Sequence, residues 1–436
     1  MNQPLPVARV ADEVIRAVLE TPVVDMHTHI YSTEFGTPVA NAAGPVDPGG
    51  LLLWGIDEML TYHYLVAEAF RVRPADEMPY ETFWRLPKQE QADHVWRCLF
   101  VERTPVSEAA TGLLTTLQAL GLDLPVSGLG GLRRWFAEQD PDDYIDRVME
   151  VANVDKMTMT NAVFDDSERA RWEAGIAPDS RFDAVLRIDP VLRDWPSAAA
   201  AMRGMGYDVA DDLSGATVAE GRRFLLDWAG RMKAVYLAAS LPPSFAFTDG
   251  GPGRPLGEQA FARIVLPACR DLGVPFAMMI GARRAANPAL GDAGDMTGRA
   301  DIEAVTNICA AFPGNRFFVT MLSRENQHEL CVAARKFGNL MIFGCWWFLN
   351  NPSLVEEITR MRVELLGTTF IPQHADARVL DQMMYKWHHN RPIIARVLAE
   401  KYEDLAGTGW PVTVEAIERD ARLLLRENYL NFIAPR

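Results

Sequence analysis

Cysteine is scarce in this sequence, and its distribution argues against a disulfide framework. The chain of 436 residues has five cysteines, an odd number, and they are widely scattered. None belongs to the CxxC spacing that is typical of structural zinc sites. Isolated thiols of this kind fit reducing conditions. We therefore expect a cytoplasmic protein.

Long hydrophobic runs and clusters of positive charge are also missing. The longest apolar run, at residues 340–349, is too short to span a bilayer, and the first 20 residues lack a cationic start followed by an apolar core. There is no run of Lys and Arg, and the formal net charge is −15 at pH 7. Because phosphate binding needs a concentrated basic surface, we expect neither a nucleic-acid partner nor a membrane partner.

The pattern that is present favours an α/β fold of the (β/α)8 TIM-barrel type. Short apolar runs alternate with helical segments along the chain, and eight such runs match the strand count of that barrel. A doubly wound open sheet is the alternative, but neither a GxGxxG nor a GxxxxGK[ST] loop follows any run. The expected strands are 23–29, 155–160, 183–189, 234–240, 274–281, 316–323, 339–347 and 367–376.

We expect a single domain over residues 1–436, in which the segments outside the strands are an insertion, loops and helices. Residues 51–152 have helical periodicity throughout, with Ile56, Leu60, His63 and Ala67 on one face, and predict a helical insertion in the first βα loop. Loops after strands open on the C-terminal face of a barrel, so the insertion is expected to cover its mouth. A helical tail follows the eighth strand. The Gly- and Pro-rich loop before the insertion is either a lid or a surface excursion.

Two imidazoles and one carboxylate are expected to meet at this mouth. His27 and His29 are two residues apart on the first strand and so point the same way, while Asp376 ends the eighth strand, which lies beside the first in a closed barrel. Such a set suits Zn²⁺ or another divalent ion with open positions. The alternative is that they are ordinary polar residues at strand ends.

Three arginines near strand ends indicate an anionic substrate. Arg187 lies at the end of the third strand, Arg324 follows the sixth, and Arg378 lies two residues after Asp376. A guanidinium group offers a rigid donor fork to carboxylates and phosphates. For each of them a salt bridge on the barrel rim is the alternative. The acidic loop 291–295 is predicted to be a solvated turn.

Other residues near the expected mouth each have a possible structural role and a possible functional role. His63, next to Tyr64, is either a core residue or a catalytic group that faces the mouth. Trp346 and Trp347 either pack on the rim or form an apolar wall for a sugar ring. His374 shares a strand face with Asp376 and could be a metal ligand or a partner of one.

Five segments together resemble the uronate isomerase family of the amidohydrolase superfamily. The resemblance covers nearly the whole chain and implies interconversion of D-glucuronate with D-fructuronate and of D-galacturonate with D-tagaturonate. It also implies one zinc ion at His27, His29 and Asp376, and a sugar acid surrounded by His63, Tyr64, Arg187, Trp346 and Arg378. The segments are Asp25-Met26-His27-Thr28-His29, Leu60-Thr61-Tyr62-His63-Tyr64-Leu65, Leu186-Arg187-Ile188-Asp189-Pro190, Phe343-Gly344-Cys345-Trp346-Trp347-Phe348 and Asp376-Ala377-Arg378.

The chain departs from this family at two positions. Many members carry a histidine on the fifth strand where this chain has Met279, and an Asp-His pair after the fourth strand where it has Ser240. The fourth strand also lacks the bridging lysine that two-metal hydrolases of the superfamily use. We therefore expect a single metal ion per chain.

The mechanism expected from the resemblance moves a proton between C2 and C1 of an open-chain sugar. Arg187 would anchor the distal carboxylate with help from His63. The phenol of Tyr64, acidified by Arg378, would exchange the proton, and Asp376 would pass protons among the hydroxyls. The alternatives are a metal-dependent hydrolase of an anionic lactone or amide, and a sugar-acid binding protein with a structural metal. The assembly state stays open, and a homo-oligomer is one of the alternatives.

Overall fold

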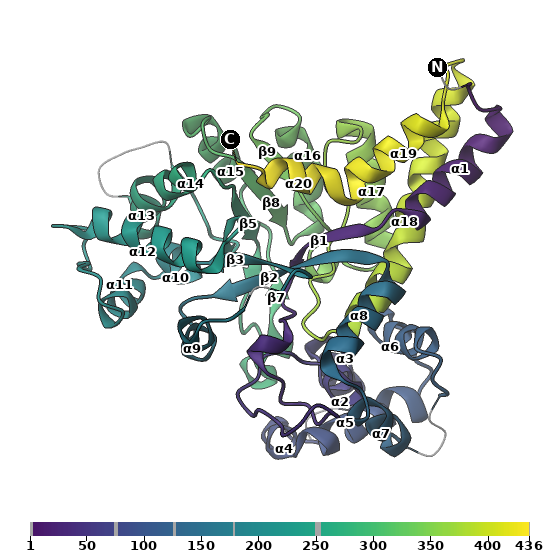
Figure 1. Ribbon diagram of the computed structural model, residues 1–436, viewed down its shortest axis with the longest axis horizontal. Coiled ribbons are helices and arrows are strands. Elements are labelled where there is room, and N and C mark those ends of the chain that lie inside the picture. The colour runs from purple at the N-terminus through teal and green to yellow at the C-terminus, as the bar shows by residue number, and fades with distance from the viewer. Residues whose placement is uncertain (1–2, 74–76, 125–127, 178, 249–253, 436) are drawn as a thin grey trace.

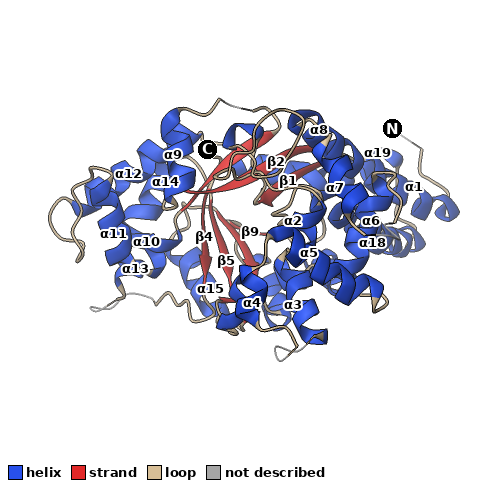
Figure 2. Cartoon of the chain, turned by 90° about the horizontal axis from the view of Figure 1, so that it is seen from below, coloured by secondary structure: helices blue, strands red, loops and turns tan. Residues whose placement is uncertain are grey.

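The core of the structure is a parallel seven-stranded sheet that curls round on itself. The computed structural model describes residues 3–73, 77–124, 128–177, 179–248 and 254–435; residues 74–76 and 125–127 of the expected insertion lie outside the described residues. The strand order is β1-β2-β3-β4-β5-β8-β9, and helices surround the sheet (Figure 2). The strands are β1 (Val23–Thr28), β2 (Val154–Ala162), β3 (Phe182–Arg187), β4 (Leu237–Leu241), β5 (Phe276–Ile280), β8 (Phe317–Met321) and β9 (Leu340–Ile342).

The apolar runs form strands because both faces of the sheet are covered. Every residue of β1, β4, β5 and β8 is buried, as expected for a parallel sheet between helices and a filled interior. Each of these seven strands starts within three residues of its predicted start. Leu237, Phe276, Phe317 and Leu340 pair in sequence across four neighbouring strands, so the strand ends on that side line up.

The segment expected to be the eighth strand is not a regular strand. A single parallel bridge joins Ile371 to Phe343, next to the end of β9. On the other side, the Asp376 amide donates to the His27 carbonyl at 3.1 Å, and the His29 amide donates to the Ala377 carbonyl at 2.8 Å. The segment therefore lies between β9 and β1 without a continuous ladder. Pro372 has no amide hydrogen, and Asp376 has a left-handed φ of 49°, so an uninterrupted ladder cannot form.

The prediction that the preceding strand extends to Trp347 was wrong. β9 ends at Ile342, and Gly344 turns the chain with a φ of 62°. Residues Trp347–Leu349 then form the 3₁₀ helix η6. Glycine adopts this left-handed conformation without the steric cost that a Cβ atom would bring.

The described residues of the 51–152 segment fold as helices that gather on one side of the sheet (Figure 1). The helix expected to run through Leu60 and His63 is broken, because Tyr62 is extended and α3 starts afresh at His63. The elements of this segment are α2 (Ile56–Leu60), α3 (His63–Val72), α4 (Tyr80–Arg85), α5 (Lys88–Trp96), the π-helix η2 (Arg97–Val101), α6 (Glu108–Ala119), α7 (Gly130–Ala137) and α8 (Pro141–Ala152).

A short hairpin that the sequence did not predict follows β5. Its strands β6 (Ala282–Arg283) and β7 (Met296–Thr297) are antiparallel, and the 3₁₀ segment η4 (Pro288–Gly294) lies between them. The other helices are α1 (Val7–Glu20), α9 (Asp166–Ala174), α10 (Asp189–Arg193), α11 (Trp195–Gly204), α12 (Thr217–Met232), α13 (Leu256–Ala260), η3 (Phe261–Val265), α14 (Leu266–Leu272), α15 (Ile302–Ala311), η5 (Arg324–Asn326), α16 (Gln327–Ala334), α17 (Pro352–Leu366), α18 (Gln382–Gly407), α19 (Val414–Arg422), η7 (Leu423–Glu427) and α20 (Asn428–Ile433).

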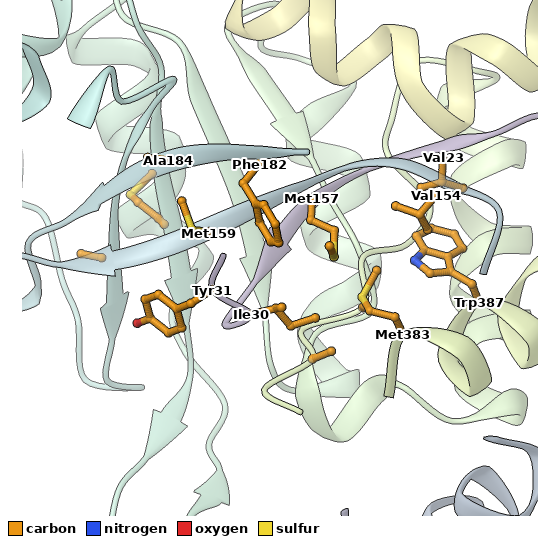
Figure 3. Packing of buried hydrophobic residues seen from close by; sticks show 14 of the residues in the cluster. Val23, Ile30, Tyr31, Val154, Met157, Met159, Phe182, Ala184, Met383 and Trp387 are labelled. Atoms are coloured by element: carbon orange, nitrogen blue, oxygen red, sulfur yellow. The ribbon is translucent and has the colours of Figure 1, made fainter. Parts of the chain in front are cut away.

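The long helix α18 connects the curled sheet to the outer helices. It packs along α1, and its N-terminal half reaches the sheet, where Trp387 lies against Val23 and Val154 at the starts of β1 and β2 (Figure 3). Within the described ranges, no helix has the length and apolar character needed to cross a membrane.

Candidate functional site

A cavity of about 280 Å³ opens where β1, β3, β4 and β5 end. It brings several chemically active groups together, since imidazoles, carboxylates, guanidinium groups and indoles line one small space. Its lining residues are His27, His29, Tyr62, His63, Arg187, Ser240, Met279, Arg284, Asp292, Asp295, Trp346, Trp347, Asp376 and Arg378.

A larger cavity, of about 820 Å³, opens at the opposite ends of β5, β8 and β9. Among the described residues that line it there is no His, Asp or Glu. Its lining includes Cys269, Cys309 and Lys336, but the imidazoles and carboxylates gather in the smaller cavity, which is therefore the candidate site.

The structure brings His27, His29 and Asp376 together. The Nε2 atoms of the two histidines lie 3.4 and 3.5 Å from the Asp376 Oδ1 atom, and the three side chains can offer ligand atoms within 4.8 Å of one another. The other ring nitrogen of His27 lies 3.2 Å from the Thr160 hydroxyl, which directs Nε2 toward the cavity. The donor set and its spacing match a small divalent metal site.

The protonation states of this group also fit metal binding. Burial lowers the pKa of His29 to about 4, so its imidazole is neutral near pH 7. Burial opposes ionisation of Asp376, but the two imidazoles hold its pKa well below its usual range. The Nε2 atom of His27 and the Oδ1 atom of Asp376 are buried without a hydrogen-bond partner. Buried polar atoms are rarely left unpaired, so a ligand is expected between them.

Arg187 and Arg378 both line the cavity but differ in how they are held. The Nε atom of Arg187 donates to Asp189 at 2.7 Å, and the same carboxylate accepts the amide of Ser240 at 2.5 Å. Arg187 is thus fixed in place and largely neutralised. The guanidinium of Arg378 lies 5.8 Å from the ring centre of Tyr31 and makes no ion pair with any described residue. Its charge is available to an anionic ligand.

Arg324 lies outside the cavity. Its guanidinium pairs with Glu357 at 3.0 Å on the surface, and 57% of its side chain is exposed. The sequence placed it at the mouth because it follows the sixth expected strand, but η5 begins at this residue and the side chain points to α17 instead. This position agrees with the salt-bridge alternative.

Four cavity residues were given no role in the sequence analysis: Tyr62, which precedes α3, and three residues of the hairpin after β5. Arg284 pairs with Asp295 and lies 5.2 Å from the ring centre of Trp347, while Asp292 lines the cavity from η4. The acidic loop was predicted to be a solvated turn rather than a second cation site, and Gly291 and Asp292 are indeed exposed; what the prediction did not include is that Asp292 and Asp295 also line the cavity. The pair of acidic residues after a glycine was the only signal in the sequence.

The break before α3 presents Tyr62 and His63 to the cavity. Burial lowers the pKa of His63 to about 3, and its ring lies 5.4 Å from that of Trp347. Tyr64 lies behind His63, with their ring centres 4.2 Å apart. Burial raises the pKa of the Tyr64 phenol well above its usual value, opposite to the expected acidified phenol. The charge of Arg378 acts on the phenol of Tyr62 instead.

The remaining cavity wall is apolar or weakly polar. Trp346 and Trp347 line one side, with ring centres 6.1 Å apart. Ser240 and Met279 are register partners on β4 and β5, so the two departures from the family pattern are neighbours in space. A wall of this kind can hold the carbon face of a sugar but supplies no further metal ligand.

His374 is fully buried behind the metal-binding group. Its ring centre lies 5.3 Å from that of His27, and neither of its ring nitrogens has a hydrogen-bond partner. It does not belong to the group of ligand atoms within 4.8 Å of one another. Gly344 leaves space for it, since a Cβ atom there would lie 1.6 Å from the His374 Nδ1 atom.

Comparison with solved structures finds three similar isomerases. A uronate isomerase from Bacillus halodurans has 47% sequence identity and a TM-score of 0.91, with 99% of this chain and 98% of that chain covered. A uronate isomerase from Thermotoga maritima has 15% identity and a TM-score of 0.73 over 98% and 97% of the two chains. A glucuronate isomerase from Caulobacter crescentus has 16% identity and a TM-score of 0.73 over 98% and 94%. No protein-family model and no curated protein sequence matches the chain.

Proposed function

The chain belongs to the uronate isomerase family, and from this premise we propose that it is an enzyme that interconverts the aldose and ketose forms of hexuronates, D-glucuronate and D-galacturonate among them. The observation that carries the proposal is the 47% identity with the Bacillus halodurans uronate isomerase over nearly the full length of both chains. The cavity supports it independently, because the charge of Arg378 suits the carboxylate or the enediolate of a sugar acid.

The reaction needs an anchor for the carboxylate, a group that carries the proton between C2 and C1, and donors for the enediolate oxygens. We assign the anchor to Arg187, because Asp189 pairs only with its Nε atom and leaves the terminal N–H groups of the guanidinium as donors. We assign the stabilisation of negative charge to Arg378. His63, which is neutral, can hydrogen-bond to the substrate and help Arg187 to hold it, and we assign the exchange of protons with the sugar hydroxyls to the ionised Asp376. Comparing Tyr64→Phe with Tyr62→Phe tests whether Tyr64, as proposed from the sequence, carries the C2 proton.

We propose Zn²⁺ as the ion held by His27, His29 and Asp376. When bound, it would polarise an oxygen atom of the substrate. We also propose that residues 370–377 take the place of the eighth strand of a (β/α)8 barrel, because their backbone hydrogen bonds reach both β9 and β1. We further propose that the enzyme is cytoplasmic and that its ligand is a small-molecule sugar acid.

The proposed reaction is tested by incubating the protein with D-glucuronate in D₂O, with and without a chelator. We expect a ketose to form and the C2 proton to exchange with solvent. Hydrolysis of the corresponding lactone without ketose formation would favour the metal-dependent hydrolase. Saturable binding without exchange would favour a sugar-acid binding protein.

The role of Arg378 is tested by Arg378→Lys, with Arg324→Gln as the matched control. Lysine keeps the charge but not the planar donor fork, so we expect kcat to fall by about 100-fold or more with the thermal midpoint unchanged. Arg324 lies on the surface against Glu357, and its replacement should leave kcat and KM as in the wild type. Full activity of Arg378→Lys would remove this residue from the mechanism.

A further inference from the structure

Asp376 is held in the site although no strand ladder holds it. Its φ of 49° lies in the left-handed region, which carries a conformational cost for a non-glycine residue. The surrounding structure must therefore fix this carboxylate. One backbone hydrogen bond, from the Asp376 amide to the His27 carbonyl, ties it to β1.

The peptide groups on either side of Ala375, the preceding residue, are held by side chains. The Ala375 amide donates to the Asp25 carboxylate at 2.9 Å, and the Ala375 carbonyl accepts from the Lys386 ammonium at 2.5 Å. Asp25 is held in turn by the indole Nε1 atom of Trp387 at 2.8 Å. Two consecutive residues of α18 thus hold the backbone next to Asp376: Lys386 directly, through the Ala375 carbonyl, and Trp387 through the Asp25 carboxylate.

Lys386 is an unusual residue for a purely structural position. Only 2% of it is exposed, and it makes no ion pair with any described residue. Its nearest polar partner is the Ala375 carbonyl, and its ammonium lies 5.8 Å from the ring centre of Tyr64. The Asp376 and Asp25 carboxylates attract this ammonium only from beyond ion-pair distance. Burying a charge without a direct ion pair is costly, and an apolar side chain of similar volume would fill the space without that cost. The ammonium therefore contributes something other than packing.

We propose that Lys386 and Trp387 are positioning residues of the active site, which hold the Ala375 peptide and the Asp25 carboxylate so that Asp376 stays against His27 and His29. Neither side chain lines the cavity, so both act through other groups. The inference rests on the proposed function where turnover is concerned, whereas the geometry of the metal group can be measured without turnover.

The test measures Co²⁺ binding to full-length Lys386→Met and Trp387→Phe by visible absorbance, together with kcat and KM for D-glucuronate. We expect the dissociation constant for Co²⁺ to rise by about 10-fold or more in Lys386→Met and by less in Trp387→Phe, because partners of metal ligands affect metal affinity on this scale. The kcat value should fall while KM changes less than about threefold, because the substrate contacts in the cavity stay in place.

Two matched controls separate positioning from general effects. Lys401→Met lies on the same helix but pairs with Glu364 at the surface, and Trp410→Phe replaces an exposed indole. Both should bind Co²⁺ as the wild type does. If Lys386→Met does not fold, Trp387→Phe, which keeps an aromatic ring, decides the question.

The sign of the change in Co²⁺ affinity is decisive. Removing a buried positive charge near a metal site would tighten metal binding if the charge acted only through space, so tighter or unchanged binding in Lys386→Met would overturn the inference. Unchanged binding in Trp387→Phe, or a wild type that does not bind Co²⁺, would overturn it as well. A wild type that binds Co²⁺ but forms no ketose would remove the proposed function instead.

Discussion

Charge at the level of single residues determines what the cavity can bind. Arg187 is neutralised by Asp189, and Arg284 is neutralised by Asp295, whereas Arg378 has no such partner among the described residues. The imidazole of His63 is uncharged near pH 7 because burial lowers its pKa. The cavity therefore offers an anion one unneutralised guanidinium, together with the terminal N–H groups of Arg187 and the neutral imidazole of His63 as further hydrogen-bonding groups.

The neutral state of His63 predicts how stability depends on pH. Its pKa is about 3 in the folded protein, against about 6.5 in an unfolded chain, so the unfolded state binds more protons between these values. The wild type should therefore lose stability as the pH falls from about 6.5 toward 3. In His63→Asn this contribution is absent, so the free energy of unfolding should fall less steeply between pH 7.5 and 5 in urea titrations. Parallel curves for the two proteins would contradict a neutral His63.

The residues of the site differ in how far the sequence could predict them. The spacing of His27 and His29 predicted that they point the same way, and both approach Asp376 although β1 ends at Thr28, one residue before His29. Asp376 reaches them because residues 370–377 lie beside β1. Arg324 and Arg284 show the limit of this reasoning. Each follows a strand, but whether a side chain turns inward depends on the loop that carries it, and the fold of a loop is not set by periodicity.

At the scale of elements, the closing segment 370–377 is the place where the prediction of strands fails. Seven apolar runs form strands because each pairs in parallel with a neighbouring run through more than one register pair. The eighth run contains Pro372 and a left-handed Asp376, and its hydrogen bonds come partly from the side chains of Asp25 and Lys386. Contacts between residues so distant in sequence leave no local pattern, so the sequence predicted the location of the segment but not its conformation.

The turn after β9 has a glycine, Gly344, where it packs against the His374 ring of the closing segment. The variant Gly344→Ala tests whether this close contact requires glycine. A methyl group at residue 344 would lie 1.6 Å from the Nδ1 atom of His374, and the φ of 62° is also unfavourable for alanine. We expect a loss of about 3 kcal/mol or more in the free energy of unfolding, because an overpacked core is combined with backbone strain.

The control for this variant is Gly338→Ala, which precedes the same strand. No atom lies within 4 Å of a Cβ atom built there. Its stability should stay within about 0.5 kcal/mol of the wild type, since an open surface position has none of the features that make substitutions costly. If chemical denaturation gave the same loss in the free energy of unfolding for both substitutions, the close contact between Gly344 and His374 would not require glycine.

At the scale of the whole molecule, α18 connects the site to the outer helices. Its N-terminal part carries Lys386 and Trp387, and one turn further on Arg391 reaches the residues just before β1 and β2. The Arg391 guanidinium is buried and donates to backbone carbonyls at the ends of α1 and α8, the strongest contacts being 2.6 Å to Thr21 and 2.9 Å to Asn153. These carbonyls lie at the points where the chain enters β1 and β2.

Arg391 is therefore expected to stabilise the fold without taking part in the reaction. Helix C-termini leave carbonyl groups without intrahelical partners, and Arg391 satisfies several of them at once although burial lowers its pKa to about 10. Replacing it with Met should cost about 3 kcal/mol of unfolding free energy, because buried carbonyls lose their donors while the cost of burying a charge is relieved. The kcat value at 25 °C should stay near that of the wild type, since Arg391 does not line the cavity.

Arg396→Met is the matched control on the same helix. Arg396 pairs with Glu356 at the surface, so its replacement should change the free energy of unfolding by no more than about 0.5 kcal/mol. A fall in kcat in Arg391→Met that matches its loss of stability would mean that the outer helices and the site do not act as separable parts.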